Sequence, residues 1–67
     1  MRENDEVLAM GAVCNVTGLT PATVYRYERA GVFPQRRRLG PRRIGWLRSD
    51  IAAWLASRPV VVPRGDR

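Results

Sequence analysis

The sequence contains no histidine and only one cysteine, Cys14. Zinc ligands in proteins are mostly cysteine and histidine, and a disulfide needs two cysteines, so we expect no metal site and no disulfide. Cys14 is most simply a small residue of the core. A strand-cleaving nucleophile at Tyr25 or Tyr27 would need an arginine–histidine type of constellation on a larger scaffold. The sequence therefore predicts neither an enzyme with catalytic residues nor a bound cofactor.

Long hydrophobic runs are missing as well. The most apolar stretch, VLAMGAVCNV at residues 7–16, is short, is interrupted by Gly11 and follows acidic residues. These features match neither a signal peptide nor a membrane span. We therefore expect a cytoplasmic protein with no membrane partner.

Lysine is the third absence, and arginine takes its place. The 67 residues include twelve arginines, and the net charge is +6 with a pI of about 11.3. Guanidinium forks pair well with phosphates and guanine edges, although a GC-rich genome would explain the use of arginine equally well. The distribution of charge along the chain is more informative than the choice of arginine. Three of the six acids lie in residues 1–6, whereas residues 29–49 hold seven arginines and no acid. So basic a segment indicates a polyanionic partner.

Two helices are predicted in the first half of the chain. Residues 7–16 carry apolar side chains at helical spacing, and Gly18 ends this helix. Ala9 stands where a capping serine or threonine is favoured, so the start of the helix stays open. The short turn TGLT leads into a second helix, and this succession is a helix-turn-helix. The apolar residues of the first helix are Met10, Val13, Cys14 and Val16.

The second helix lies within TPATVYRYERAGVFP, residues 20–34. Thr20 is a suitable N-cap, Pro21 fits the first helical position, and Gly31 supplies a left-handed stop. At about 100° per residue, Val24 and Tyr27 fall on one buried stripe. The opposite face holds four residues that are not natural core residues: Ala22, Tyr25, Arg26 and Arg29.

Two short strands are predicted after Pro34, joined by a turn at Gly40-Pro41. Two strands alone are not stable, so they must pack on the helices. The residues expected to point inward are Leu39, Ile44 and Trp46, with Trp46 or Leu47 filling the space behind the second helix.

A third helix is predicted for residues 50–57, with Ser49 as its cap and Arg58-Pro59 as its stop. Ile51, Trp54 and Leu55 have the spacing of a buried face. We expect a flexible acidic N-terminus at residues 1–6, one domain at residues 7–59 and a C-terminal tail at residues 60–67. The tail begins with Val60, Val61 and Val62, which either bind a neighbouring copy or cover the core of their own domain.

Helix, turn, helix, basic hairpin and helix is the layout of a small α+β winged helix-turn-helix domain. The segments TGLTPATVYRYERAGVFP and LGPRRIGWLRSDIAAWLASRP resemble the small phage excisionases and AlpA-type regulators, whose domain is similar to the DNA-binding end of MerR proteins. The resemblance covers residues 8–59. It implies that residues 21–30 enter the major groove of double-stranded DNA and that the hairpin, or wing, reaches the adjacent minor groove.

Carried over position by position, the resemblance places the same four residues of the second helix in the groove. Arg26 is the candidate for a base contact and Arg29 for a phosphate contact. Ala22 is small and apolar where the family often has a polar reader, so it can at most touch a thymine methyl. Tyr25 replaces a basic residue of some excisionases, which favours a phosphate or sugar contact there. The expected DNA-binding residues are Thr20, Ala22, Thr23, Tyr25, Arg26, Arg29, Arg36, Arg38, Arg42 and Arg43.

Two further expectations concern the charged residues. Thr20 and Thr23 serve the helix N-terminus first, which is also where a phosphate binds. Because residues 36–38 alternate along a strand, only some of their arginines can face DNA. Glu28 either holds a wing arginine in position or is a solvated charge.

Three functions fit these features. The first is an excisionase, or recombination directionality factor, which binds and bends attachment-site DNA together with neighbouring copies of itself and directs a phage integrase toward excision. The second is an AlpA-type transcription regulator that binds a promoter with the same surface. The third is an RNA-binding or protein-binding module. A single module buries roughly 600–1,000 Å² on DNA, which is little for tight binding, so affinity from neighbouring copies favours the excisionase.

Overall fold

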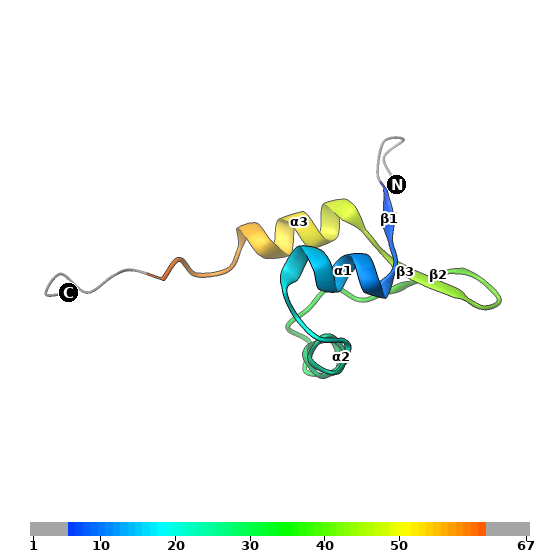
Figure 1. The fold of residues 1–67 in the computed structure, drawn as a ribbon, viewed down its shortest axis with the longest axis horizontal. Coiled ribbons are helices and arrows are strands. Elements are labelled where there is room, and N and C mark those ends of the chain that lie inside the picture. Colours follow the sequence, from blue (N-terminus) through cyan, green and yellow to red (C-terminus); the bar gives the residue numbers. More distant parts are fainter. Residues whose placement is uncertain (1–5, 62–67) are drawn as a thin grey trace, which may run out of the picture.

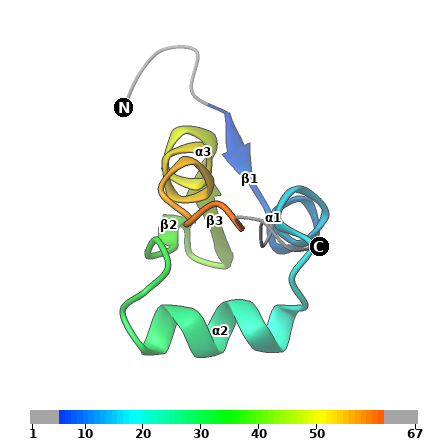
Figure 2. The same cartoon turned by 90° about the vertical axis from the view of Figure 1, so that its left-hand side faces the viewer.

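The computed structural model describes residues 6–61, and this part of the chain forms a winged helix-turn-helix. Helix α2 runs beneath α1 and α3, the β2–β3 hairpin projects from one end of the domain, and the chain leaves α3 toward the opposite end (Figures 1 and 2). The predicted α+β fold is therefore confirmed. The elements are β1 (Val7–Leu8), α1 (Met10–Thr17), α2 (Pro21–Arg29), β2 (Arg37–Gly40), β3 (Arg43–Leu47) and α3 (Arg48–Ala56).

Strand β1 replaces the first turn of the predicted first helix. Its two residues pair antiparallel with β3, Val7 with Leu47 and Leu8 with Trp46. The start of the first helix, which the sequence left open, therefore lies after Ala9, because residues 7 and 8 pair with a segment far along the chain. Gly45 permits this pairing, since a Cβ there would lie 2.7 Å from Val7 Cγ1 and 2.9 Å from the Leu8 carbonyl oxygen.

Helix α1 begins after Ala9, which is its N-cap and provides no side-chain hydrogen bond. The helix ends at Gly18, as predicted, and the Gly18 N–H donates to the Cys14 carbonyl at 2.7 Å. Cys14 is half-buried and packs against the core.

Helix α2 has the ends that its sequence predicts. The Thr20 hydroxyl accepts a hydrogen bond from the Thr23 N–H at 3.2 Å, and Pro21 occupies the first helical position. At the other end Gly31 has a φ of 78°, and its N–H donates to the Glu28 carbonyl at 3.1 Å. The Val32 N–H donates to the Tyr27 carbonyl at 3.0 Å. This pair of bonds is a Schellman motif, so both predicted helix signals are confirmed.

The core is centred on Trp46, which is fully buried at the end of β3. Its indole N–H donates to the Pro34 carbonyl at 3.0 Å, and the Phe33 ring meets it edge-on at 6.5 Å between centroids. Trp54 from α3 contacts Phe33 from another side at 4.7 Å between centroids. Of the two residues predicted to fill the space behind the second helix, Trp46 shares the core cluster with Val24 of α2, and Leu47 is also buried. The core cluster consists of Leu8, Val13, Val24, Phe33, Trp46 and Ile51.

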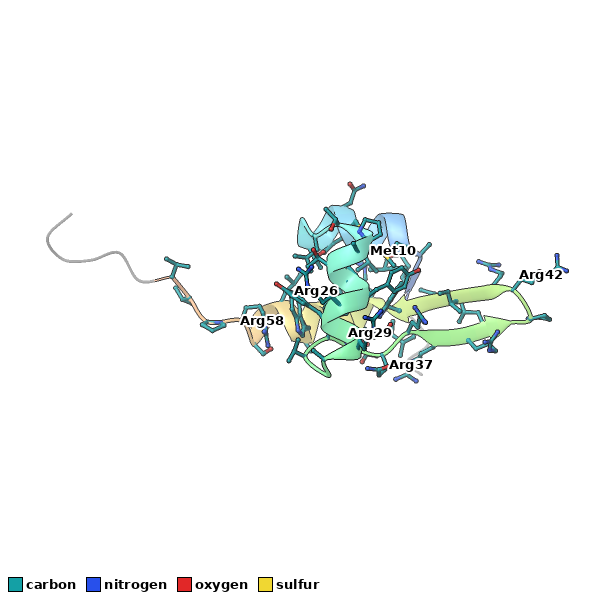
Figure 3. All side chains as sticks on the ribbon, turned by 90° about the horizontal axis from the view of Figure 1, so that it is seen from below. Met10, Arg26, Arg29, Arg37, Arg42 and Arg58 are labelled. Atoms are coloured by element: carbon teal, nitrogen blue, oxygen red, sulfur yellow. The ribbon has the colours of Figure 1, made fainter. Side chains whose placement is uncertain are left out.

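The wing, meaning β2, β3 and the turn between them, extends beyond the helices (Figures 1 and 3). Leu39 and Ile44 were predicted to point into the core, but they are 42% and 38% exposed. That prediction was wrong because only residues 45–47 of the hairpin reach the core. The turn at Gly40-Pro41 is confirmed, and a bulge at Leu39 shifts the register from Arg38–Ile44 to Gly40–Arg43.

Helix α3 follows β3 without a loop. Its N-cap is Leu47 rather than the predicted Ser49, which lies inside the helix. The earlier start has a tertiary cause, since the Arg48 N–H donates to the Glu6 carbonyl at 2.7 Å and the Arg48 guanidinium pairs with the Glu6 carboxylate at 3.2 Å. Ile51 is buried, as predicted.

The described part of the tail, Val60 and Val61, does not cover the core of its own domain. Val60 and Val61 are 83% and 90% exposed, and Val62 lies outside the described residues. Most of the N-terminal segment 1–6 and of the tail 60–67 also lies outside them, so the predicted domain boundaries stay a prediction. Within residues 6–61, no helix is long and apolar enough to span a membrane.

Candidate nucleic-acid interface

The recognition face, defined as Ala22, Tyr25, Arg26 and Arg29, is exposed along one side of α2. Val24 is fully buried on the opposite side, so the helical-wheel prediction of the two faces is confirmed. Figure 3 shows α2 in front of the rest of the domain, with Arg26 and Arg29 on it. Contact of this face with DNA is a separate matter and stays a prediction.

Arg26 is weakly held by its neighbours. Its guanidinium donates to the Thr23 hydroxyl at 3.5 Å and lies 6.0 Å from the centroid of the Tyr27 ring. Thr23 in turn accepts a hydrogen bond from the Thr20 hydroxyl at 3.0 Å. The two threonines thus serve the N-terminus of α2, as expected, and Thr23 also directs Arg26. The long bond leaves the guanidinium free to take a better acceptor.

A groove of about 510 Å³ separates α2 from the wing. Arg36 and Arg38 line it from the wing side, whereas Arg37 forms an ion pair with Asp50 of α3 at 3.3 Å. The expected alternation of these three arginines is therefore confirmed. The lining residues of this helix–wing groove are Tyr25, Glu28, Arg29, Gln35, Arg36, Arg38 and Ile44.

Arginines also occupy the far end of the wing. Arg42 lies in the turn and Arg43 begins β3, and both are exposed. Figure 3 places Arg42 far from the body of the domain. Five arginines of the recognition face and the wing take part in no ion pair within residues 6–61: Arg26, Arg29, Arg38, Arg42 and Arg43. Their charge is therefore not neutralised by a carboxylate of the described chain.

Glu28 is the residue whose role the structure changes most. Only 9% of it is exposed, and its carboxylate pairs with the Arg36 guanidinium at 3.3 Å. Of the two interpretations of Glu28, the solvated charge is wrong, and the arginine that Glu28 holds, Arg36, lies immediately before the wing rather than in it. The sequence signal was that Glu28 is the one acid in a basic region. No sequence signal pointed to Gln35 or Ile44, which the fold brings to the same groove.

Comparison with known proteins agrees with this architecture. The family model described as prophage CP4-57 regulatory protein (AlpA) matches residues 6–59. The DNA-binding transcriptional activator AlpA of Escherichia coli strain K12 is 35% identical over 60 residues, which cover 78% of this chain and 83% of that protein. An uncharacterized protein, ORF88, of enterobacteria phage P4 is 34% identical over 61 residues, covering 91% of this chain and 69% of the relative. No solved structure is significantly similar. The chain thus belongs to the AlpA family of prophage regulatory proteins.

Proposed function

We propose that this protein regulates a phage element by binding double-stranded DNA with α2 and the wing. One observation carries the proposal: the recognition face borders the same groove as the arginines at the base of the wing, with Tyr25 and Arg29 on one side and Arg36 and Arg38 on the other. A groove with arginines on both of its sides suits a polyanion. The similarity to a protein named a DNA-binding transcriptional activator supports DNA as that polyanion.

The dimensions support insertion of α2 into the major groove. An α-helix with its side chains, such as α2, is about 10–12 Å in diameter, and the major groove is about 12 Å wide. With α2 there, the sugar–phosphate strand between the major and minor grooves would run along the helix–wing groove. Arg29, Arg36 and Arg38 would contact its phosphates, and Arg42 and Arg43 would reach the next minor groove. Arg26 would read a base edge.

The wing provides a direct test of DNA contact. Replacing Arg42 and Arg43 with alanine should weaken binding to every sequence and reduce the salt dependence by about one unit for each lost phosphate contact. The loss should be larger on A·T-rich flanks, where the minor groove is narrow. Fluorescence anisotropy titrations over a range of salt concentrations measure both effects.

Arg58→Ala is the matched control for the wing variant. Arg58 is also exposed, but its guanidinium carbon lies over the Trp54 ring, 4.5 Å from the ring centroid. It lies at the end of the domain opposite Arg42 (Figure 3). We expect its salt slope to equal that of the wild type. An unchanged slope in the Arg42 and Arg43 variant would exclude the wing from the DNA interface.

Promoter regulation is the first candidate for the biological role, because a relative with 35% identity is named a transcriptional activator. Action as an excisionase is the second candidate. One module offers roughly 600–1,000 Å² to DNA, so tight binding would need neighbouring copies on adjacent sites. The exposed Val60 and Val61 beyond α3 would suit such a neighbour contact. A phage integrase would then be a further partner.

The two roles make different predictions on the same DNA. A promoter regulator should protect a promoter region in footprinting and change transcription of a reporter, with both recombination reactions unaltered. An excisionase should bind several adjacent sites cooperatively beside an attachment site, retard DNA by bending and stimulate excision by the cognate integrase while inhibiting integration. Bending 20–30 base pairs by 40–90° costs on the order of 1–6 kcal/mol, which several cooperating copies can offset.

Structured RNA serves as the competitor in these assays. Displacement of the protein from its DNA site by an equal concentration of RNA would contradict the proposal and favour the RNA-binding alternative. We expect duplex DNA to compete much better, because the deep, narrow major groove of A-form RNA does not admit a helix such as α2.

A further inference from the structure

We propose that Glu28 is a positioning residue that locks the wing to α2, so that the two elements meet DNA as one rigid unit. The inference deepens the proposed function and rests on it where DNA is concerned. Its structural part, the fixed angle between wing and helix, can be tested without DNA.

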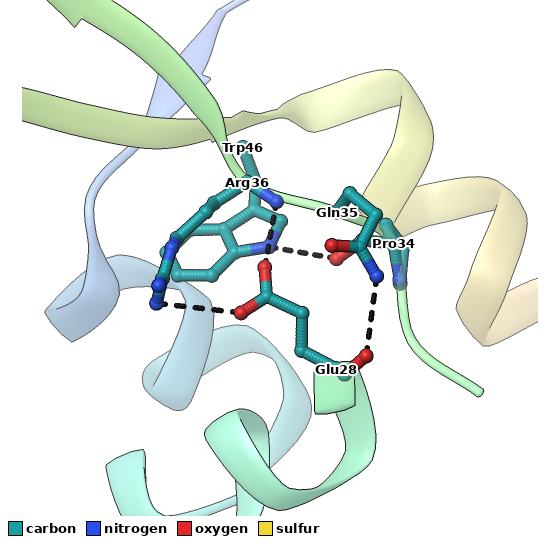
Figure 4. A network of polar contacts seen from close by, with 5 residues as sticks. All are labelled: Glu28, Pro34, Gln35, Arg36 and Trp46. Atoms are coloured by element: carbon teal, nitrogen blue, oxygen red, sulfur yellow. Dashed lines mark hydrogen bonds and ion pairs between the residues drawn. The ribbon is translucent and has the colours of Figure 1, made fainter. Parts of the chain in front are cut away.

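The carboxylate of Glu28 holds the segment that leads into the wing. Its Oε2 accepts a hydrogen bond from the backbone N–H of Arg36 at 2.7 Å, and its Oε1 pairs with the Arg36 Nη1 at 3.3 Å. The Glu28 backbone carbonyl accepts a third hydrogen bond, from the Gln35 side chain at 3.1 Å. Figure 4 shows this network around the last turn of α2. Two successive residues are thereby fastened to α2 immediately before β2 begins at Arg37.

The same segment is fastened to the core from its other side. The buried Trp46 donates its indole N–H to the Pro34 carbonyl at 3.0 Å. Residues 34–36 are therefore held between Trp46 and Glu28 (Figure 4). The outer part of the wing projects away from the helices (Figure 3), so the wing joins the domain through this anchored segment and through residues 45–47 of β3. In the proposal, the anchored segment sets the angle at which the wing leaves the domain.

The Arg36 side chain extends the network to the recognition face. Its guanidinium carbon lies 5.1 Å from the centroid of the Tyr25 ring, a cation–π distance. Glu28 thus acts through two separate parts of Arg36. The backbone N–H determines the path of the wing, and the guanidinium orients Tyr25.

The physical chemistry explains why an acid is suited to this position. Hydrogen bonds to an ionised carboxylate are shorter and stronger than neutral ones, so a single side chain can hold a projecting hairpin. A carboxylate that is almost fully buried is costly unless it is paired, and Glu28 is paired with both the N–H and the guanidinium of Arg36. Removing the carboxylate would leave the Arg36 N–H to water and would release the wing.

The first experiment measures the angle between wing and helix directly. Spin labels are attached to cysteines introduced by Ala22→Cys on α2 and Arg42→Cys at the wing tip, in a Cys14→Ala background. Pulsed electron–electron double resonance should give a narrow distribution of distances between the two labels with Glu28 present and a clearly broader one in Glu28→Ala. Glu28→Gln keeps an acceptor for the Arg36 N–H but loses the charge, so we expect an intermediate width.

Two control variants separate locking of the wing from general stability. Asp50→Asn breaks the other ion pair of a wing arginine, Asp50 with Arg37 at 3.3 Å, which is more exposed and involves no backbone N–H. Arg36→Ala removes the guanidinium but keeps the N–H that Glu28 binds. Both should retain the narrow distribution. All samples are frozen from solutions kept well below their unfolding temperatures, so that each variant is folded. Glu28→Gln replaces Glu28→Ala if Glu28→Ala does not fold. An unchanged width in the Glu28 variants would overturn the proposal, whether or not the protein binds DNA.

The second experiment is a double-mutant cycle on DNA. Replacing Arg42 and Arg43 with alanine in the wild type should reduce the affinity for DNA by a measurable factor. In the Glu28→Ala background, the same replacement should reduce the affinity by a factor that is about tenfold smaller. A difference of this size lies within the usual range of coupling between interacting residues. In Asp50→Asn the factor should be unchanged. A full wing effect in Glu28→Ala would contradict the coupling. Absence of DNA binding by the wild type would instead overturn the proposed function, and the distance measurement would still decide the role of Glu28.

Discussion

Trp46→Ala should leave the domain largely unfolded at room temperature. Removing a large aromatic side chain from a core costs about 3–5 kcal/mol, and Trp46 is fully buried. A domain of this size has little more stability than that, with about 3–5 kcal/mol from a single small core. The substitution also removes the hydrogen bond to the Pro34 carbonyl and the edge-type ring contact with Phe33.

Circular dichroism at 222 nm during a thermal melt measures this loss. Trp46→Phe is the matched control, because it retains an aromatic ring and loses only the indole N–H and part of the volume. We expect it to fold with a lowered melting temperature. Trp54→Phe, at a half-buried position of α3, should be milder still. A cooperative melt of Trp46→Ala within a few degrees of the wild type would show that the core is not centred on this residue.

Arg26→Ala should cost about 1–3 kcal/mol at the specific DNA site and relax the base preference beneath α2. Arg26 lies on the exposed recognition face, and a bidentate fork to guanine is the commonest specific arginine contact. Its hydrogen bond to Thr23 is long, at 3.5 Å, so a base edge would displace it at little cost. The helix itself should tolerate alanine, since Arg26 is exposed and alanine is a strong helix former.

Titrations on the specific site and on a random duplex distinguish the two kinds of contact. A base contact predicts a large loss on the specific site and a small loss on random DNA. Arg29→Ala is the comparison, because Arg29 is on the same face but nearer the helix–wing groove, and we expect it to weaken binding to both duplexes equally and to lower the salt slope by about one unit. Equal weakening by Arg26→Ala on both duplexes would assign Arg26 to the phosphates.

Helix α2 was predictable because the signals that shape it are local. The Thr20 cap, Pro21 and the Gly31 stop act within one turn of the helix, and each is found in the structure. The division of α2 into a buried stripe and an exposed face follows from helical periodicity alone. The family resemblance rested on the same segment, and the candidate residues on α2 are all exposed except the half-buried Thr23. Alternation along a strand also correctly separated Arg37 from Arg36 and Arg38.

The sequence by itself thus determined the helix-turn-helix, the recognition face, the hairpin turn and the family, because capping, periodicity and turn chemistry depend on neighbouring residues. Only the tertiary structure decided the rest. Strand β1 pairs with β3 at a point where residue 45, far along the chain, lacks a Cβ that would block the approach, and α3 starts at Arg48, whose N–H bonds to the Glu6 carbonyl. Ile44 is exposed because the hairpin extends beyond the core, which only residues 45–47 of the hairpin reach. Glu28 is buried against Arg36 because the chain folds back after Gly31, and a contact made by such a return has no local signature in the sequence.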